Sequence, residues 1–426
     1  MVDDLSVFQW EVYGLADNPF DTRPISFQNR RLTFDVFVGR SAETHKLENV
    51  LYSSSSTRTL VFGERGVGKT SFVNYVRNKN NEKYFTPSSE IEIQRKWDET
   101  DFLKNTIIHS YYTLVQLKKS KNSFIDDKFI ADFAEKIGLE VKTDSLTAGI
   151  SIGLISAAKT SGKTNSVLDN PRYLRELFDN LLTKIVESGK KGAIFHYNNL
   201  DRFDDEQELS SFLESIRDIV LTENAHFIFV GNRFTADVFK NTDMFNRVLD
   251  DRIIINPIDI SELKETVKRR FLSLKTPNGH FISPCYLECV DALYMLYNGN
   301  TSYIFKSLKQ AIIKNSENSP KTLAVADMKT ILRGLVNERL SQISPRAKTI
   351  LLHLLKKKRL NNSALAKDLS ILAQNVSAYM KQLQGVDLVF SVKEGRQRFF
   401  EPSEVAAWLL LDGAGKSNHR RLSEYS

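Results

Sequence analysis

A glycine-rich segment in the first quarter of the chain has the residue types that hold a phosphate group. Residues 63–70 read Gly-Glu-Arg-Gly-Val-Gly-Lys-Thr, which fits the pattern G-x-x-x-x-G-K-T. In such a loop the glycines let backbone amides face phosphate oxygens, the lysine reaches the β and γ phosphates, and the threonine hydroxyl binds magnesium. The sequence therefore predicts a nucleotide site with Thr70 as the metal ligand and with these candidate residues: Gly63, Glu64, Arg65, Gly66, Val67, Gly68, Lys69, Thr70 and Ser71.

The segments around this loop predict the elements that position it. Short runs rich in β-branched and aromatic residues are typical of strands, and they occur at 59–62, 90–93, 192–197, 226–230 and 252–255. Patterns of helical period lie between them, for example over 101–117 and 171–188. This alternation predicts an α/β fold with a parallel sheet that is covered by helices on both faces.

The last third of the chain predicts a helical subdomain and a terminal module. Helical periods continue over 261–274 and 303–314 without strand signals. Ser344 and Pro345 then mark a helix start, because serine caps a helix and proline costs no hydrogen bond at the first position. Helices near 363–369 and 373–383 and alternating runs at 388–392 and 398–400 follow. Three helices and a β-hairpin predict a winged helix-turn-helix.

Three short motifs resemble those of AAA+ ATPases of the clade that includes replication initiators and the related STAND-type signalling ATPases. They are Asn18-Pro19-Phe20, the box Phe37-Val38-Gly39-Arg40, which in this group lies against the adenine, and the sensor-1-like Asn232-Arg233. The resemblance covers about residues 16–338 and, separately, the winged helix. It implies a P-loop AAA+ parallel sheet with a helical lid, ATP and Mg²⁺ as cofactors, Val38, Gly39 and Arg40 in the cofactor site, and assembly into an oligomer or with a protein partner.

Together these patterns predict the domain boundaries. We expect an N-terminal extension at 1–36, a nucleotide-binding domain at 37–257 with an insertion around 118–168, a helical lid at 258–340, a winged helix at 341–411 and a flexible basic tail at 412–426.

The chain departs from the family pattern at the second nucleotide motif. An apolar strand there should end in two acids, of which the first holds a magnesium-bound water and the second orients or deprotonates the attacking water. Asn198 and Asn199 stand in their places. An amide oxygen can bind magnesium, but an amide cannot act as a base, and general-base catalysis is typically worth about 10²- to 10⁴-fold. We therefore expect at most slow or partner-stimulated ATP hydrolysis.

Asp201 can replace the missing acids only if the chain turns back after Asn198. Along a straight strand its Cα atom would lie about 10 Å further on, at roughly 3.3 Å per residue. A plain turn after a buried strand is the alternative interpretation of the two asparagines.

Two more positions concern catalysis. Arg247 is placed like an arginine finger donated to a neighbouring subunit, and a surface arginine is the alternative. Ser302 occupies the place where the family usually has the sensor-2 arginine, so weak coupling of the lid to the γ phosphate is expected. The candidate catalytic residues are Asn198, Asn199, Asp201, Asn232 and Arg247.

The net charge is concentrated at the carboxyl end. Residues 341–426 contain 14 Lys and Arg against 7 Asp and Glu, whereas the preceding 340 residues contain 45 of each. The whole net charge of +7 therefore lies in the terminal module and its tail. Such asymmetry indicates a polyanionic partner, and a solvated charged face is the alternative.

The third helix of the terminal module has a polar outer face. Val376, Met380 and Leu383 are spaced to face the core. Outward amides and hydroxyls can read base edges in a major groove, while cations contact phosphates. The candidate residues for duplex DNA are Gln374, Asn375, Ser377, Lys381, Lys393, Arg396 and Arg398. The alternative is a module that only packs on the ATPase body, as the winged helix does in STAND proteins.

Composition excludes other classes of protein. With 41% apolar and 26% charged residues the chain is globular rather than disordered. Its longest weakly polar run, 146–158, is shorter than the roughly 20 residues of a membrane span, and no apolar segment follows the acidic start. Cys285 and Cys289 give no disulfide framework and are interpreted as packing residues. We expect a cytoplasmic protein without a membrane partner.

Two functions of different classes remain open. In the first, ATP sets the assembly state and the winged helix holds duplex DNA. In the second, a STAND-like signalling or defence scaffold closes around the nucleotide and binds a protein partner, with the winged helix as an internal module. The charge distribution favours the first function, and the asparagine pair favours the second.

Overall fold

The structure is a computed structural model that describes residues 10–28, 31–138, 168–203, 205–277, 279–317, 319–394 and 397–411. The expected tail at 412–426, the greater part of the expected insertion, residues 139–167, and the candidate Arg396 lie outside the described residues. Among the helices described, none is both long and apolar enough to cross a membrane.

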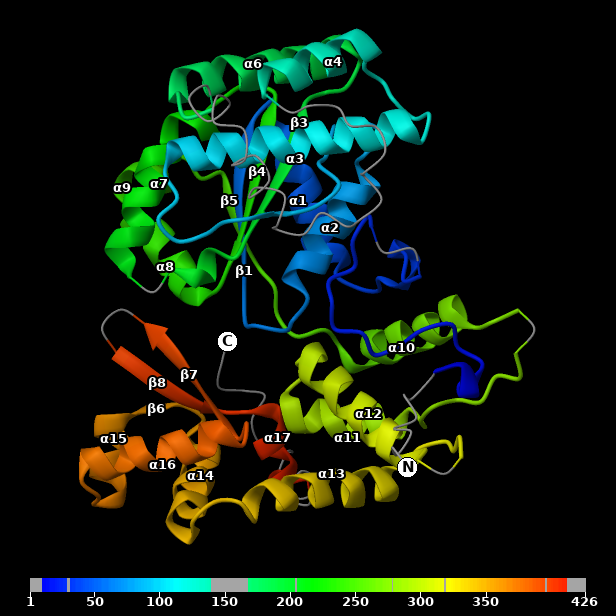
Figure 1. Cartoon of the computed structure of the whole chain (residues 1–426), viewed down its shortest axis with the longest axis vertical. Coiled ribbons are helices and arrows are strands. Elements are labelled where there is room, and N and C mark those ends of the chain that lie inside the picture. The colour runs from blue at the N-terminus through cyan, green and yellow to red at the C-terminus, as the bar shows by residue number, and fades with distance from the viewer. Residues whose placement is uncertain are drawn as a thin grey trace, which may run out of the picture.

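A parallel sheet forms the centre of the upper half of the molecule in Figure 1. Its strand order is β2-β3-β4-β1-β5, and each neighbouring pair is parallel. The strands are β1 (Thr57–Phe62), β2 (Ile91–Glu92), β3 (Ala193–Asn198), β4 (Ala225–Gly231) and β5 (Asp251–Ile254). Because β3 and β4 are buried on both faces, they read as nearly continuous apolar runs. The predicted parallel sheet is confirmed at all of its expected strands.

Helices cover both faces of this sheet (Figure 1). On one face α1 (Ser41–Ser53) and α2 (Lys69–Lys79) enclose an apolar core with Val61, Ile228 and Ile253. The other face carries a larger core beneath α3 (Glu99–Lys119), α4 (Asp127–Lys136), α6 (Pro171–Glu187), α7 (Glu206–Val220), α8 (Arg233–Asn241) and α9 (Asp243–Val248). The two layers hold the carboxyl ends of β1, β3 and β4 rigidly at one edge.

The helical lid contains part of the N-terminal segment in its core. The lid consists of α10 (Ile260–Leu274), α11 (Glu288–Tyr297), α12 (Thr301–Asn315) and α13 (Val325–Leu340). Trp10, Tyr13 and Phe20 share its apolar cluster, and the Ala16 amide donates to the Leu274 carbonyl at 2.7 Å. The described part of the expected N-terminal extension therefore packs as an integral layer of the lid.

The terminal module has the helices and the hairpin that the sequence predicts. Its elements are α14 (Pro345–Lys357), α15 (Asn362–Leu369), α16 (Ala373–Gly385), α17 (Glu404–Ala407) and the strands β6 (Leu360–Asn361), β7 (Val389–Glu394) and β8 (Gln397–Pro402). The Ser344 hydroxyl accepts from the Ala347 amide and caps α14 as expected. The strand β6 pairs with β8, and the sequence missed it because two residues show no alternation.

The terminal module is joined to the lid by one continuous core. Trp408 is fully buried, and its indole nitrogen donates to the Ser307 hydroxyl of α12 at 2.9 Å. The Tyr297 hydroxyl donates to the backbone carbonyl of Glu404 at 2.8 Å. Figure 1 shows α17 lying between α12 and α13 of the lid and the rest of the module. The lid and the module are consequently coupled mechanically.

Candidate functional site

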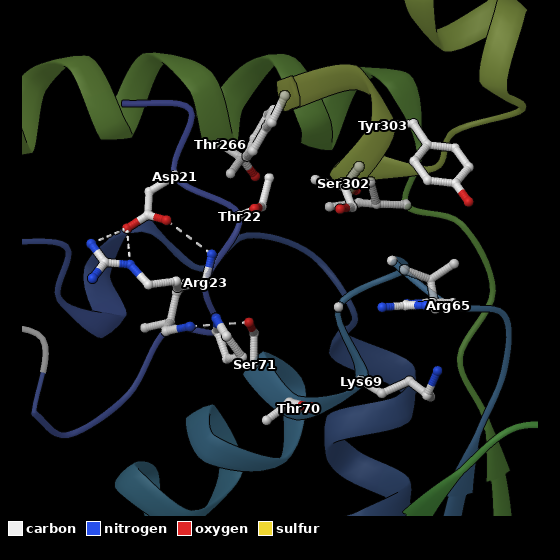
Figure 2. A pocket seen from close by; sticks show the side chains of 18 of the residues that line it. Asp21, Thr22, Arg23, Arg65, Lys69, Thr70, Ser71, Thr266, Ser302 and Tyr303 are labelled. Carbon is white, nitrogen blue, oxygen red and sulfur yellow. Dashed lines mark hydrogen bonds and ion pairs between the residues drawn. The ribbon is translucent and has the colours of Figure 1, made fainter. Parts of the chain in front are cut away.

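A cavity of about 870 Å³ lies where the sheet, the lid, the N-terminal segment and the terminal module meet. Figure 2 shows Thr266 of α10 and Ser302 and Tyr303 of α12 on the side opposite Lys69 and Thr70. Further lining residues include Asp21–Ile25 of the N-terminal segment and, from the terminal module, Phe390 and Glu404.

The glycine-rich loop has the backbone geometry of a phosphate cradle. It connects β1 to α2, and Gly66 and Gly68 adopt φ values of +87° and +92°, which side chains rarely tolerate. A Cβ atom on Gly66 would lie 2.5 Å from the Asn300 amide oxygen, so glycine is also required by packing. Of the predicted loop residues, Arg65 to Ser71 line the cavity, whereas Gly63 and Glu64 lie behind it.

The Lys69 ammonium is folded over this loop. It donates to the carbonyl oxygens of Gly63 at 3.0 Å and of Glu64 at 2.8 Å. Burial lowers the pKa of Lys69 to about 8, against the opposing effect of the nearby Asp201 carboxylate. Lys69 therefore remains mostly protonated at pH 7 and offers a positive charge to an anion.

Thr70 and Asn198 present two oxygen atoms side by side. The Thr70 hydroxyl donates to the Asn198 amide oxygen at 3.4 Å, and both residues line the cavity. Mg²⁺ prefers oxygen ligands and usually retains several waters beside substrate phosphates. The residues present fit magnesium, but because both oxygens are neutral, the phosphates must supply most of the negative charge around the ion.

The chain does turn back after Asn198, which is the condition for Asp201 to act. Asn199 adopts a left-handed conformation with φ +69°, a region in which asparagine is enriched. The 3₁₀ turn Leu200–Arg202 follows directly and returns Asp201 to the cavity wall, where its charge acts on Lys69. The turn that the alternative interpretation expects is present at Asn199, and Asn199 also lines the cavity.

The box around Arg40 supports the loop, and Arg40 itself lines the cavity. The Arg40 side chain is buried and donates to the Val67 carbonyl at 2.7 Å and to the Asn256 carbonyl at 2.8 Å. Gly39 lies against the Glu262 carboxylate of α10 and does not line the cavity, whereas Val38 does. Arg40 is thus a positioning residue for the loop.

Two candidate catalytic residues lie outside the cavity wall. Asn232 follows β4, and its amide oxygen accepts from the Thr235 amide at 2.9 Å in the cap of α8. Arg247 is exposed on α9 and does not line the cavity. Its position leaves open both the contribution to a neighbouring subunit and the surface role.

The lid touches the loop directly. The Asn300 amide nitrogen donates to the Arg65 carbonyl at 2.8 Å, and the backbone amide of Ser302 donates to the Gly66 carbonyl at 3.2 Å. One side-chain and one backbone hydrogen bond therefore link the start of α12 to the glycine loop.

The sequence analysis missed several charged residues of the cavity. They are Asp21, Arg23, Arg270, Lys306 and Glu404. Arg270 is buried, lies over the Phe305 ring at 4.6 Å and donates to the Pro19 and Asp21 carbonyls. No short motif contains these residues, because the chain brings them together from segments hundreds of positions apart.

The candidate DNA-binding residues have different environments. Gln374, Asn375, Lys381 and Arg398 are exposed, as are Lys356, Lys357 and Lys358. Ser377, which was predicted to point outward, is half-buried, and its hydroxyl accepts from the Asn362 side-chain amide of α15 at 2.9 Å. Lys393 belongs to β7.

Comparison with solved structures finds weak similarity to P-loop ATPases. The Walker-type ATPase PABY2304 of Pyrococcus abyssi is 17% identical, with a TM-score of 0.46 over 92% of this chain and 99% of that one. The ORC2 protein of Aeropyrum pernix in ADPNP–ADP complexes is 11% identical, with a TM-score of 0.44 over 94% and 98%.

The ORC1 protein of the same organism in complex with DNA is 14% identical, with a TM-score of 0.41 over 89% of this chain and 93% of that one. No protein-family model matches the sequence, and none of the curated proteins matches it either. These are likenesses of overall shape at low identity. The chemistry of the site is therefore interpreted from its own residues.

Proposed function

We propose that the protein binds ATP with Mg²⁺ in the cavity, hydrolyses it slowly and uses the nucleotide to control assembly and binding of duplex DNA by the terminal module. The observation that carries the nucleotide site is the convergence of Lys69, Thr70 and Asn198 beside a glycine loop with positive φ values. Backbone amides, one partly buried cation and two neutral oxygens form a site for a polyphosphate and its metal ion.

Each residue has a defined task in this proposal. Lys69 neutralises phosphate charge, and Thr70 and Asn198 offer oxygen ligands to Mg²⁺, which supplies further charge neutralisation when bound. Asp201 lines the cavity and its charge acts on Lys69, so in this proposal it is the base for a water near the phosphates. With one carboxylate instead of two adjacent acids, turnover stays well below the median enzyme rate of about 10 s⁻¹.

DNA binding is supported by the charge of the terminal module and by its exposed polar face. Gln374, Asn375 and Lys381 of α16 are exposed, and Arg398 is exposed on β8. These residues suit a helix that enters a major groove and a hairpin that contacts the backbone.

A role as a signalling scaffold is the second candidate. It is favoured by the docking of α17 on the lid through Trp408 and Tyr297, which makes the module part of the ATPase body. In this case a protein replaces DNA as the partner.

Binding of labelled duplex DNA by the full chain, with and without ATP and at several salt concentrations, tests the proposed function. The logarithm of the affinity is expected to fall linearly with the logarithm of salt concentration, by about 0.9 per phosphate contacted. ATP is expected to change the affinity in wild type but not in the Lys69→Ala variant. No DNA binding at low salt in either state would favour the scaffold.

A further inference from the structure

The helix α12 carries a cation one turn beyond Ser302. Lys306 follows Ser302 by four residues, so both lie on one face of the helix, and both line the cavity. Side chains of a helix lean toward its N-terminus. The N-terminus of α12 is bonded to the glycine loop, so the Lys306 side chain leans along the cavity wall toward the place where the phosphates would lie.

The terminal module supplies the partner of this cation. The Lys306 ammonium lies 3.1 Å from a Glu404 carboxylate oxygen. The Glu404 side chain is only 18% exposed and lines the same cavity, whereas Lys306 is 44% exposed. Glu404 is fixed in place, because the preceding Ser403 caps α17 and Tyr297 binds the Glu404 carbonyl.

The two groups make opposite contributions to a bound polyphosphate. A carboxylate in the cavity repels phosphate oxygens, and an ammonium attracts them. While Lys306 is paired with Glu404, its charge is partly neutralised and its position is set by the terminal module. Hydrogen bonds from a cation to phosphate are stronger than a half-exposed ion pair, so a phosphate can take Lys306 from Glu404.

We propose that Lys306 is the phosphate-binding cation of the lid and that Glu404 holds it while phosphate is absent. The inference rests on the proposed nucleotide site and names its regulation. ATP and the docked terminal module compete for the Lys306 ammonium group. Binding of the nucleotide therefore changes the contact between Lys306 and α17. By thermodynamic linkage, weakening the pair strengthens nucleotide binding.

A double-mutant cycle on the full chain tests this competition, with a non-hydrolysable ATP analogue titrated by calorimetry. Glu404→Gln is expected to tighten binding by about two- to fivefold. Lys306→Met is expected to weaken it by about tenfold, and Lys306→Arg, which keeps the charge, should restore most of the affinity. When Lys306→Met is already present, Glu404→Gln should change the affinity less than it does in wild type, because only the direct repulsion of phosphate by the carboxylate remains.

Lys309→Met is the matched control, since Lys309 is an exposed lysine on the same helix and does not line the cavity. It should bind the analogue like wild type. The proposal is overturned if Lys306→Met binds as tightly as wild type, or if the effect of Glu404→Gln is as large without Lys306 as with it, since Glu404 would then act by repulsion alone. Either result leaves the nucleotide site intact, whereas failure of the wild-type chain to bind the analogue removes both proposals.

Discussion

The glycine loop and the terminal module are two regions with predicted chemistry, and they differ in how their side chains are held. Lys69 is folded into the loop by two carbonyl oxygens, and Arg40 braces the loop. By contrast, Gln374, Asn375 and Lys381 are exposed on one surface helix. A buried group acts through one fixed geometry, whereas exposed groups act through summed and screened charge. Single changes should therefore have large effects in the cavity and small, additive effects on the module.

The largest effect of a single change in the cavity is expected at Asp201, which lines the cavity although its side chain is exposed. Asp201→Asn should lower the slow ATP hydrolysis rate by about 100-fold while leaving ATP affinity within about threefold, because it removes the available base and keeps the shape. Single-turnover hydrolysis and calorimetric titration measure the two quantities. Glu214→Gln is the matched control, because Glu214 is exposed on α7 and does not line the cavity. A rate that survives Asp201→Asn would show that another group activates the water.

An effect of intermediate size on nucleotide affinity is expected when the pH is raised. Phosphate binds protonated Lys69, and the pKa of Lys69 in the free protein is about 8. Bound phosphate raises this pKa, so above pH 8 binding must take up a proton and the affinity should fall by up to about tenfold per pH unit. Below pH 7 the lysine is already charged and its contribution should be constant. Calorimetry near pH 9 in two buffers of different ionisation enthalpy measures the proton uptake, and its absence would contradict a buried Lys69.

The smallest effect is expected on the module. Arg398→Ala should flatten the salt dependence of DNA binding by about 0.9 and weaken binding to all sequences alike. Arg172→Ala is the control, since Arg172 is 90% exposed on α6, at the opposite end of the molecule in Figure 1. If Arg398→Ala abolished DNA binding, Arg398 would make a single essential contact. Single changes would then have large effects on the module as well as in the cavity, which would contradict the comparison.

The sequence predicted those elements whose structure depends on residues close together in the chain. The glycine loop, the strands and the cap of α14 depend on residues within a few positions of one another. The parallel sheet followed because each strand is a short apolar run between helical patterns.

Contacts between distant segments account for what the sequence did not predict. Lys306 and Glu404 are 98 positions apart. Trp10, near the N-terminus, packs against lid residues that lie in the second half of the chain. Ser377 accepts a hydrogen bond from Asn362 of a neighbouring helix, a partner that no local pattern predicts. Asp201 lies at the cavity wall because Asn199 adopts a left-handed backbone conformation. Asparagine favours this conformation but does not require it, so the sequence alone could not predict the turn.

Binding of ATP through Lys69 is tested most directly by calorimetric titration of the full chain with ATP in excess Mg²⁺. Wild type and the exposed-site control Lys309→Ala should bind nucleotide with equal affinity, and Lys69→Ala should show no measurable binding although it remains folded by circular dichroism. Unchanged affinity in Lys69→Ala would contradict the assignment of the glycine loop as the phosphate site.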